Sequence, residues 1–194
     1  LLLGIVYFYA GIAKLNSDWL FEAMPLKIWL PSNSNLPIIG SMLNQNWAHF
    51  AFSWIGAIYD LTIPFLLINR RTRWFGFSLV IIFHILTKIL FPIGVFPYVM
   101  IVSSLLFFDA KFHNTILKFI SKHLKIDFSI FNNGKEKIQQ YNLITKTKLV
   151  FVSFFILFQL VFPFRHLFYP GELFWTEEGF RFSWRVMLME KAGY

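Results

Sequence analysis

The sequence contains no cysteine and little charge. Its 194 residues therefore form no disulfide and no thiolate metal site, and cysteine usage does not indicate a redox compartment. Charged residues make up 14% of the chain, 57% of residues are hydrophobic, 21% are aromatic, and the mean hydropathy is +0.58. Ordinary soluble domains carry about 25% charged residues. The composition therefore predicts an integral membrane protein.

Sequence motifs of several enzyme classes are also missing. There is no GxSxG, no P-loop glycine pattern and no dinucleotide fingerprint, so hydrolase, kinase and Rossmann functions have no support. The five histidines show no HExxH spacing and no His–His pair four residues apart, which predicts no metal site. The net charge of +8 comes from basic residues between apolar runs rather than from one basic face, so we expect a lipid membrane and not nucleic acid as the partner.

Long apolar runs predict about five membrane spans. The first run ends near residue 15 and is shorter than the roughly 20 residues of a full span, so we expect an internal fragment whose first helix begins before Leu1. The expected fold is an all-α, multi-span helical bundle over residues 1–164, with residues 165–194 as an exoplasmic segment leading to a C-terminal domain that the sequence lacks. The other predicted spans are 50–69, 74–91, 98–108 and 149–164. The run 98–108 is short, so it either begins near Gly94 or forms a tight or partly re-entrant hairpin with the span before it.

Two basic segments predict the orientation of the bundle. Residues 70–73 hold three arginines, and residues 109–148 hold eight lysines. The second segment is expected to form an amphipathic cytoplasmic linker helix followed by a turn at 132–134. The positive-inside rule places both segments in the cytoplasm. The apolar stripe of the linker helix consists of Phe112, Ile116, Phe119, Ile120 and Leu124.

The segments on the opposite side are then expected to converge. Residues 16–48 carry helix caps, three prolines and three tryptophans, and predict a structured interfacial loop with short helices. Alternation of the spans places this loop, the turn at 92–97 and the tail 165–194 on the exoplasmic side. Lys14 ends the first helix on the same side.

Lys14 is the leading candidate for chemistry. Burial disfavours the charged form of a lysine, so a neutral amine becomes available as a base near neutral pH. The alternative is that Lys14 reaches the membrane interface and pairs with Asp18 one turn later. Asp60, His84 and Lys88 also lie within predicted spans, where ionisable groups usually face a bundle interior. For Asp60 a structural role, such as anchoring a basic partner, is favoured.

Three separated stretches resemble one enzyme family. They are AGIAKLNSDWL at 10–20, FPIGVFPYVM at 91–100 and RHLFYPGELFWTEEGFRFSWRVML at 165–188. In the same order, they resemble the vitamin K-dependent gamma-glutamyl carboxylases and their bacterial HTTM-domain relatives. The resemblance implies that Lys14 is the base that deprotonates vitamin K hydroquinone. Oxygen then adds to give a stronger base, a protein glutamate loses its γ-proton, and carbon dioxide is captured as the epoxide leaves.

The resemblance also implies a set of site residues. His49 and His84 join Lys14 as catalytic residues, and Asp60 and His166 support them as polar neighbours. Reduced vitamin K, oxygen, carbon dioxide and a glutamate-containing peptide or protein are the implied reactants, without a metal. We expect a bacterial plasma membrane with the site on the exoplasmic side. The implied quinone pocket consists of Tyr7, Phe96, Met100, Phe180, Trp184 and Met187.

Two alternatives remain open from the residues. One is a quinol epoxidase that does not carboxylate peptides. The other is a non-catalytic membrane module that binds lipid or quinone, or that anchors a soluble domain. In the second case Lys14 and Asp18 form only an interfacial pair.

Overall fold

Helices form all the regular structure in the part of the chain that the structure describes. The computed structural model describes residues 1–124, 143–185 and 188. The prediction of an all-α membrane protein is confirmed. In chain order the elements are α1 Leu2–Ala13, α2 Ser17–Leu20, α3 Leu26–Trp29, η1 Pro31–Asn33, α4 Gly40–Leu43, α5 Asn46–Ile68, α6 Arg73–Leu90, α7 Phe96–Ser104, η2 Leu105–Phe107, α8 Ala110–Leu124, α9 Leu143–Val161, η4 Phe162–Phe168 and α10 Leu173–Thr176.

Three stretches are long and apolar enough to cross a membrane. They are α5, α6 and Lys146–Phe168, which combines most of α9 with η4. Two further predicted spans correspond to shorter apolar helices, Leu2–Ala13 and Phe96–Phe107. Each of these covers only about 18 Å at 1.5 Å per residue, well short of a hydrocarbon layer of about 30 Å. The short α7 lies against α6, as expected for a tight hairpin.

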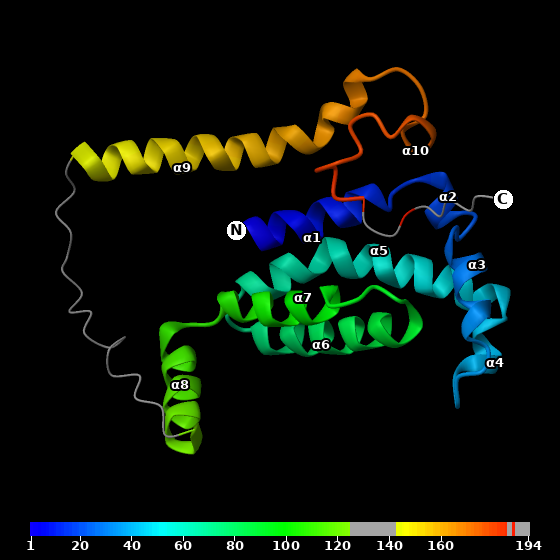
Figure 1. Ribbon diagram of the computed structural model, residues 1–194, viewed down its shortest axis with the longest axis horizontal. Coiled ribbons are helices and arrows are strands. Elements are labelled where there is room, and N and C mark those ends of the chain that lie inside the picture. The colour runs from blue at the N-terminus through cyan, green and yellow to red at the C-terminus, as the bar shows by residue number, and fades with distance from the viewer. Residues whose placement is uncertain (125–142, 186–187, 189–194) are drawn as a thin grey trace.

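Four helices, α1, α5, α6 and α7, form the core of the bundle and run along one common direction (Figure 1). The connections between them gather at the two ends of the bundle. We call one end the lysine end; it holds α2 to α4, the turn between α6 and α7, and the η4–α10 tail. The opposite end holds the α5–α6 connection and α8, and we call it the arginine end. The predicted convergence of the loop, the turn and the tail is therefore confirmed. Their placement on the exoplasmic side stays a prediction.

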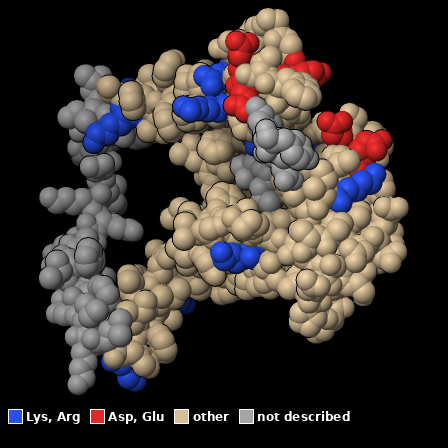
Figure 2. Space-filling model, turned by 45° about the vertical axis from the view of Figure 1, so that its right-hand side comes forward, with Lys and Arg blue, Asp and Glu red and all other residues tan. Residues whose placement is uncertain are grey.

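Charge differs between the two ends. Five exposed carboxylates lie at the lysine end, on the loop and the tail, whereas Asp109 is the one carboxylate described at the arginine end. Figure 2 shows these acidic groups at the lysine end, with uncharged surface over much of the body between. Arginines of the α5–α6 connection and lysines of α8 lie at the opposite end. Arginines also lie on the tail at the lysine end, at Arg165, Arg181 and Arg185, so basic residues occupy both ends and the expected orientation stays a prediction. The five carboxylates are Asp18, Glu22, Glu172, Glu177 and Glu178.

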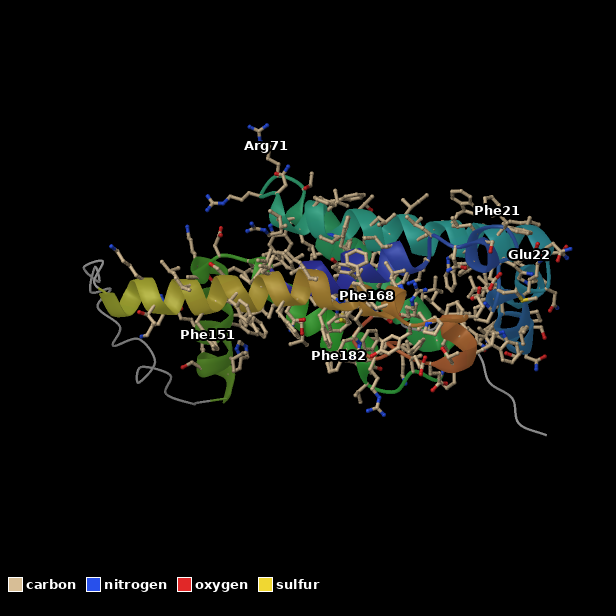
Figure 3. All side chains as sticks on the ribbon, turned by 90° about the horizontal axis from the view of Figure 1, so that it is seen from above. Phe21, Glu22, Arg71, Phe151, Phe168 and Phe182 are labelled. Carbon is tan, nitrogen blue, oxygen red and sulfur yellow. The ribbon has the colours of Figure 1, made fainter. Side chains whose placement is uncertain are left out.

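Helix α9 contacts the bundle along little of its length. Most of its described side chains are apolar and exposed, as Phe151 illustrates in Figure 3. A helix that is apolar on all sides suits a lipid environment. Near its end, Tyr9 Oη donates a hydrogen bond of 2.5 Å to the Leu160 carbonyl, which ties α9 to α1.

Helix α8 stands crosswise to α1, α5, α6 and α7 (Figure 1). It confirms the predicted amphipathic helix over 110–124, and its crosswise direction suits a position along a membrane surface. The predicted turn at 132–134 lies outside the described residues.

Helices α1 and α5 approach each other closely at Gly11. A Cβ atom at this position would lie 2.7 Å from Leu61 Cγ and 2.9 Å from the Leu61 backbone nitrogen, so no side chain fits without a shift of the helices. Lys14 follows less than one turn later. The close approach therefore sets how deeply Lys14 reaches toward α5.

We expect Gly11→Ala to push α1 away from α5 and to lower the free energy of unfolding by about 1–3 kcal/mol, the usual cost of overpacking. Thermal unfolding of the detergent-solubilised protein, followed by tryptophan fluorescence, measures this. Gly4→Ala is the matched control, because a Cβ atom there meets only Pro64 Cβ at 3.6 Å. Equal melting temperatures for the two variants would contradict the prediction.

Candidate functional site: a cavity around a buried lysine–aspartate pair

A cavity of about 230 Å³ lies between α1, α5, α6 and α7 and the loop 16–48 at the lysine end. Each helix contributes one face to it. On α1 the lining residues include Tyr7, Ala10 and Lys14, which are spaced by three and four residues and so share a helix side. The other lining residues include Trp19, Trp29, Phe52, Ile55, Gly56, Asp60, Phe83, His84, Leu86, Thr87, Leu90, Phe91, Ile93, Phe96 and Met100.

Lys14 and Asp60 form an ion pair at the wall of this cavity. Lys14 Nζ lies 2.6 Å from Asp60 Oδ2, and the two residues are only 8% and 6% exposed. The same amine lies 3.4 Å from the Ala10 carbonyl oxygen and 5.3 Å from the centroid of the Trp19 ring. Every contact of the amine is thus internal, and the pair joins α1 to α5.

The alternative pairing of Lys14 with Asp18 is wrong in this structure. Asp18 is exposed on α2, where its carboxylate accepts a hydrogen bond from the Ser17 hydroxyl at 3.4 Å. Helix α1 ends at Ala13, and Asn16 starts α2 by accepting a hydrogen bond of 2.9 Å from the Trp19 amide. Because the helix breaks between Lys14 and Asp18, the one-turn spacing that would pair them does not apply. The structure shows Asp60 paired with a basic partner, which is the contact foreseen for it.

The buried environment of this pair makes its geometry important. Removing two charges from water is costly, and their attraction offsets the cost only when the geometry is good. The distance of 2.6 Å supplies that geometry. The arrangement places the Lys14 amine, held by its partner carboxylate, at the wall of the cavity, where a ligand could contact it.

Tyr7 and His84 form a second polar centre on the same cavity. Tyr7 Oη and His84 Nε2 lie 2.9 Å apart, and the residues are 2% and 3% exposed. The other ring nitrogen of His84, Nδ1, is buried and has no hydrogen-bond partner among the described residues. A buried polar atom without a partner is costly, so a ligand group that bonded it would be favoured. The cavity therefore offers two polar centres within otherwise apolar walls.

Sequence reasoning missed most of the aromatic wall. Tyr7, Phe96 and Met100 were predicted for the quinone pocket and do line the cavity, whereas Trp19 and Trp29 were assigned only to the interfacial loop and Phe83 was not singled out. Trp19 is fixed by a reciprocal pair of hydrogen bonds with Ser53, in which its Nε1 donates to the Ser53 carbonyl at 2.8 Å and the Ser53 hydroxyl donates to the Trp19 carbonyl. A usable signal was present on α5 and α6, where lining residues repeat every three or four positions around Asp60 and His84.

The structure places two predicted histidines away from the cavity. His49 lies in the second turn of α5, buried, with Nε2 2.8 Å from the Leu43 carbonyl oxygen. It holds the end of α4 against α5 and lies about 16 Å along the helix from Asp60. His166 lies on η4, where Nδ1 contacts the Pro163 carbonyl oxygen at 2.8 Å. Neither residue lines the cavity.

The predicted quinone contacts from the tail also lie elsewhere. Phe180 and Trp184 do not line the cavity, and Met187 lies outside the described residues. The tail nevertheless reaches the same end of the bundle, because Leu188 packs in one apolar cluster with Ala13 and Trp19. The tail therefore covers the region beside Lys14 without entering the cavity wall.

A cationic cluster occupies this tail. Arg185 Nη2 lies 3.2 Å from His166 Nε2, and Arg165 Nη2 donates to the Arg181 carbonyl at 3.0 Å. Partial burial lowers the pKa of Arg185 from its ordinary value. Gly179 permits the fold, since a Cβ atom there would lie 2.6 Å from His166 Cα and its φ of +76° is left-handed. The Nε atoms of Arg165 and Arg185 have no hydrogen-bond partner among the described residues.

No group of three or more histidines, aspartates or glutamates that suits a metal ion is present among the residues that the structure describes. The polar groups of the cavity are an amine, a carboxylate, a phenol and an imidazole, which suit proton transfer and hydrogen bonding to a small organic ligand.

The fold and the cavity define a helical membrane protein with an ionisable pair buried in its bundle, and comparison with known families agrees. The HTTM domain family matches residues 1–112, so the chain belongs to this family. The lumenal domain of vitamin K-dependent gamma-carboxylase matches residues 144–194. Both matches support the resemblance to the vitamin K-dependent gamma-carboxylases that the sequence predicted. No solved structure matches the chain.

The buried pair gives a prediction for stability. Lys14→Met or Asp60→Leu alone leaves one buried group without its partner, so each should lower the free energy of unfolding by about 3–5 kcal/mol. The double variant should recover most of this loss, because it leaves no unpaired charge. Unfolding of the purified protein in detergent, compared across the double-mutant cycle, measures the coupling.

The control pair is Lys27 and Glu22, which lie 3.7 Å apart near the surface. Lys27→Met should cost less than about 1 kcal/mol, as expected for an exposed pair. Additive losses from the two core substitutions would show that Lys14 and Asp60 do not interact.

Proposed function

We propose that this protein is a vitamin K-dependent carboxylase-like membrane enzyme. It binds reduced vitamin K in the cavity at the lysine end and uses Lys14 as the initiating base. The substrate of carboxylation is a glutamate side chain of a peptide or protein, presented from the exoplasmic side. The observation that carries the proposal is the buried amine of Lys14, held against Asp60 at the wall of an apolar cavity.

The cavity suits the head of a quinol. Its walls are mostly aromatic and aliphatic, as a flat apolar ring requires, and its volume of about 230 Å³ is smaller than the 300 Å³ or more of pockets for drug-sized ligands. A compact ring system would fill it, and a long lipid tail would have to extend outside. The two polar centres, Lys14–Asp60 and Tyr7–His84, match a ligand with two hydroxyl groups.

Lys14 and Asp60 act as one unit in the proposed reaction. In the neutral form of the pair, the Lys14 amine accepts a proton from a quinol hydroxyl, and the resulting ammonium stabilises the anion left behind. Asp60 positions the amine and accepts the proton that prepares it. The burial of both groups excludes water, which would otherwise compete for the proton.

The bound quinol would supply the oxygenation chemistry. Overall, the quinol is oxidised to its epoxide, one dioxygen is reduced to the epoxide oxygen and water, and the glutamate γ-carbon exchanges a proton for carbon dioxide. Arg165 and Arg185 on the tail are cations that could pair with an anionic glutamate substrate, although the exposed carboxylates Glu172, Glu177 and Glu178 lie on the same tail.

Lys14→Ala should abolish formation of vitamin K epoxide, because the first deprotonation loses its base. The full-length protein in nanodiscs is supplied with reduced vitamin K, oxygen, bicarbonate and a glutamate peptide, and epoxide and carboxyglutamate are followed together. A loss of at least 100-fold is expected for removal of a general base. Lys27→Ala is the matched control, since Lys27 lies at the same end but does not line the cavity.

The two products distinguish the possible functions. Epoxide with carboxyglutamate, both lost in Lys14→Ala, supports the carboxylase. Epoxide without carboxyglutamate makes the protein a quinol epoxidase. If the folded parent makes no epoxide, or if Lys14→Ala retains full activity, the proposed role of Lys14 is wrong and a binding or anchoring module is favoured.

Tyr7→Phe should raise KM for the quinol by about 5- to 10-fold, because His84 loses its partner and the cavity loses a hydroxyl. Tyr9→Phe is the matched control on the same helix, since the Tyr9 hydroxyl bonds Leu160 outside the cavity. Steady-state epoxidation at varied quinol concentration gives both constants. Equal KM values for the two variants would remove Tyr7 from quinol binding.

A further inference from the structure

A second cavity lies at the arginine end, far from the proposed quinol site. Its volume is about 340 Å³, and it opens between the α5–α6 connection and the start of α8. We propose that it binds the phosphate headgroup of an anionic phospholipid from the surrounding membrane. Its polar lining consists of Arg70, Arg73, Asp109, Lys111 and Thr115.

The charges of this cavity favour an anion. Three cations line it against one carboxylate. Arg73 satisfies that carboxylate, since its Nη1 lies 3.4 Å from Asp109 Oδ1, and its remaining nitrogens donate to the Leu67 and Ile68 carbonyls at 3.0 and 3.3 Å. Arg70 and Lys111 form no ion pair with any residue that the structure describes. Two cations are therefore left to bind a phosphate group.

The aromatic side of the cavity favours a lipid over a soluble anion. Phe108 and Phe112 stack with ring centroids 4.5 Å apart, and Trp74 packs edge-on against Phe108 at 4.8 Å. Trp74 is 59% exposed on α6, a helix long enough to span the membrane. Tryptophan in such a position marks the interfacial depth of a bilayer. The wall would contact the glycerol and upper acyl region of a lipid, for which a free phosphate has no equivalent.

Helix α8 places the cavity at headgroup level. It turns crosswise at the end of the core helices and carries Lys111, Lys118 and Lys122 together with an apolar stripe (Figure 1). A basic amphipathic helix of this kind lies along a membrane surface. Basic pockets beside the cytoplasmic ends of membrane helices bind anionic headgroups, and each nearby cation adds about 1 kcal/mol.

The chain offers a matched control for this site. Arg71 belongs to the same connection as Arg70 and carries the same charge, yet it does not line the cavity. In Figure 3 its side chain points away from the body of the protein. A general attraction between a basic surface and anionic lipid would involve both arginines equally, whereas a built site depends on Arg70.

The experiment measures binding of a fluorescent phosphatidylglycerol to the full-length protein in neutral detergent micelles. The unlabelled competitors are phosphatidylglycerol, phosphatidylcholine and inorganic phosphate. Arg70→Gln and Lys111→Gln should each weaken binding about fivefold and should weaken it about 25-fold together, as expected for about 1 kcal/mol per cation. Arg71→Gln should stay within twofold of the parent. Phosphatidylcholine and millimolar phosphate should fail to displace the probe.

Three results would overturn the proposal. An equal loss of affinity in Arg71→Gln would show a diffuse attraction between the basic surface and the lipid instead of a site. Displacement of the probe by phosphatidylcholine would show that the site does not select a negatively charged headgroup. Displacement by inorganic phosphate would indicate a site for a soluble anion. Arg73 is left intact because it holds the end of α5, and the melting temperature of each variant checks folding. If the double variant does not fold, the lipid affinities of Lys111→Gln and Arg71→Gln are compared instead, and an equal loss in both contradicts the proposal.

Discussion

The contact between Lys14 and Asp60 is the interaction on which the arrangement of the bundle depends. A charged pair 2.6 Å apart is stable in apolar surroundings only if the two helices hold both groups at this distance, because separation would leave each charge buried without a partner. The backbones of α1 and α5 must therefore come close, which Gly11 permits. The ring of Trp19 then covers the amine from the loop side. The positions of α1, of α5 and of the loop between them are thus all linked to this one ion pair.

The same constraint explains why the cavity lies where it does. An ion pair buried between two helices excludes close apolar packing at that point, and α6 and α7 join α1 and α5 in lining the space beside it. Tyr7 and His84 supply a second hydrogen-bonded contact that joins α1 to α6. A site with few polar groups and low polarity strengthens each electrostatic interaction within it. The polar contacts that hold the helices together are therefore also the groups available for proton transfer.

The membrane completes the packing that the protein leaves open. Helix α9 exposes apolar side chains along most of its described length, and the outer faces of α5 and α6 are similar. In water such surfaces would be unstable, whereas lipid acyl chains can cover them. At the arginine end, cations and aromatic rings meet at the expected depth of the headgroups. Lipid is thus both a solvent for the bundle and, in our proposal, a specific ligand.

The sequence by itself determined the membrane class, the positions of the apolar helices, the convergence of three segments at one end and the family, because composition, apolar length and motif order are local properties. It also singled out Lys14, because a lysine at the end of an apolar run can be recognised in the sequence even when its ion-pair partner is not known. Only the tertiary structure decided that this partner is Asp60 and that His49 anchors a loop away from the cavity. Residue spacing shows which side chains share a helix face, but the rotation and depth of each helix, set by packing at Gly11, decide which faces meet.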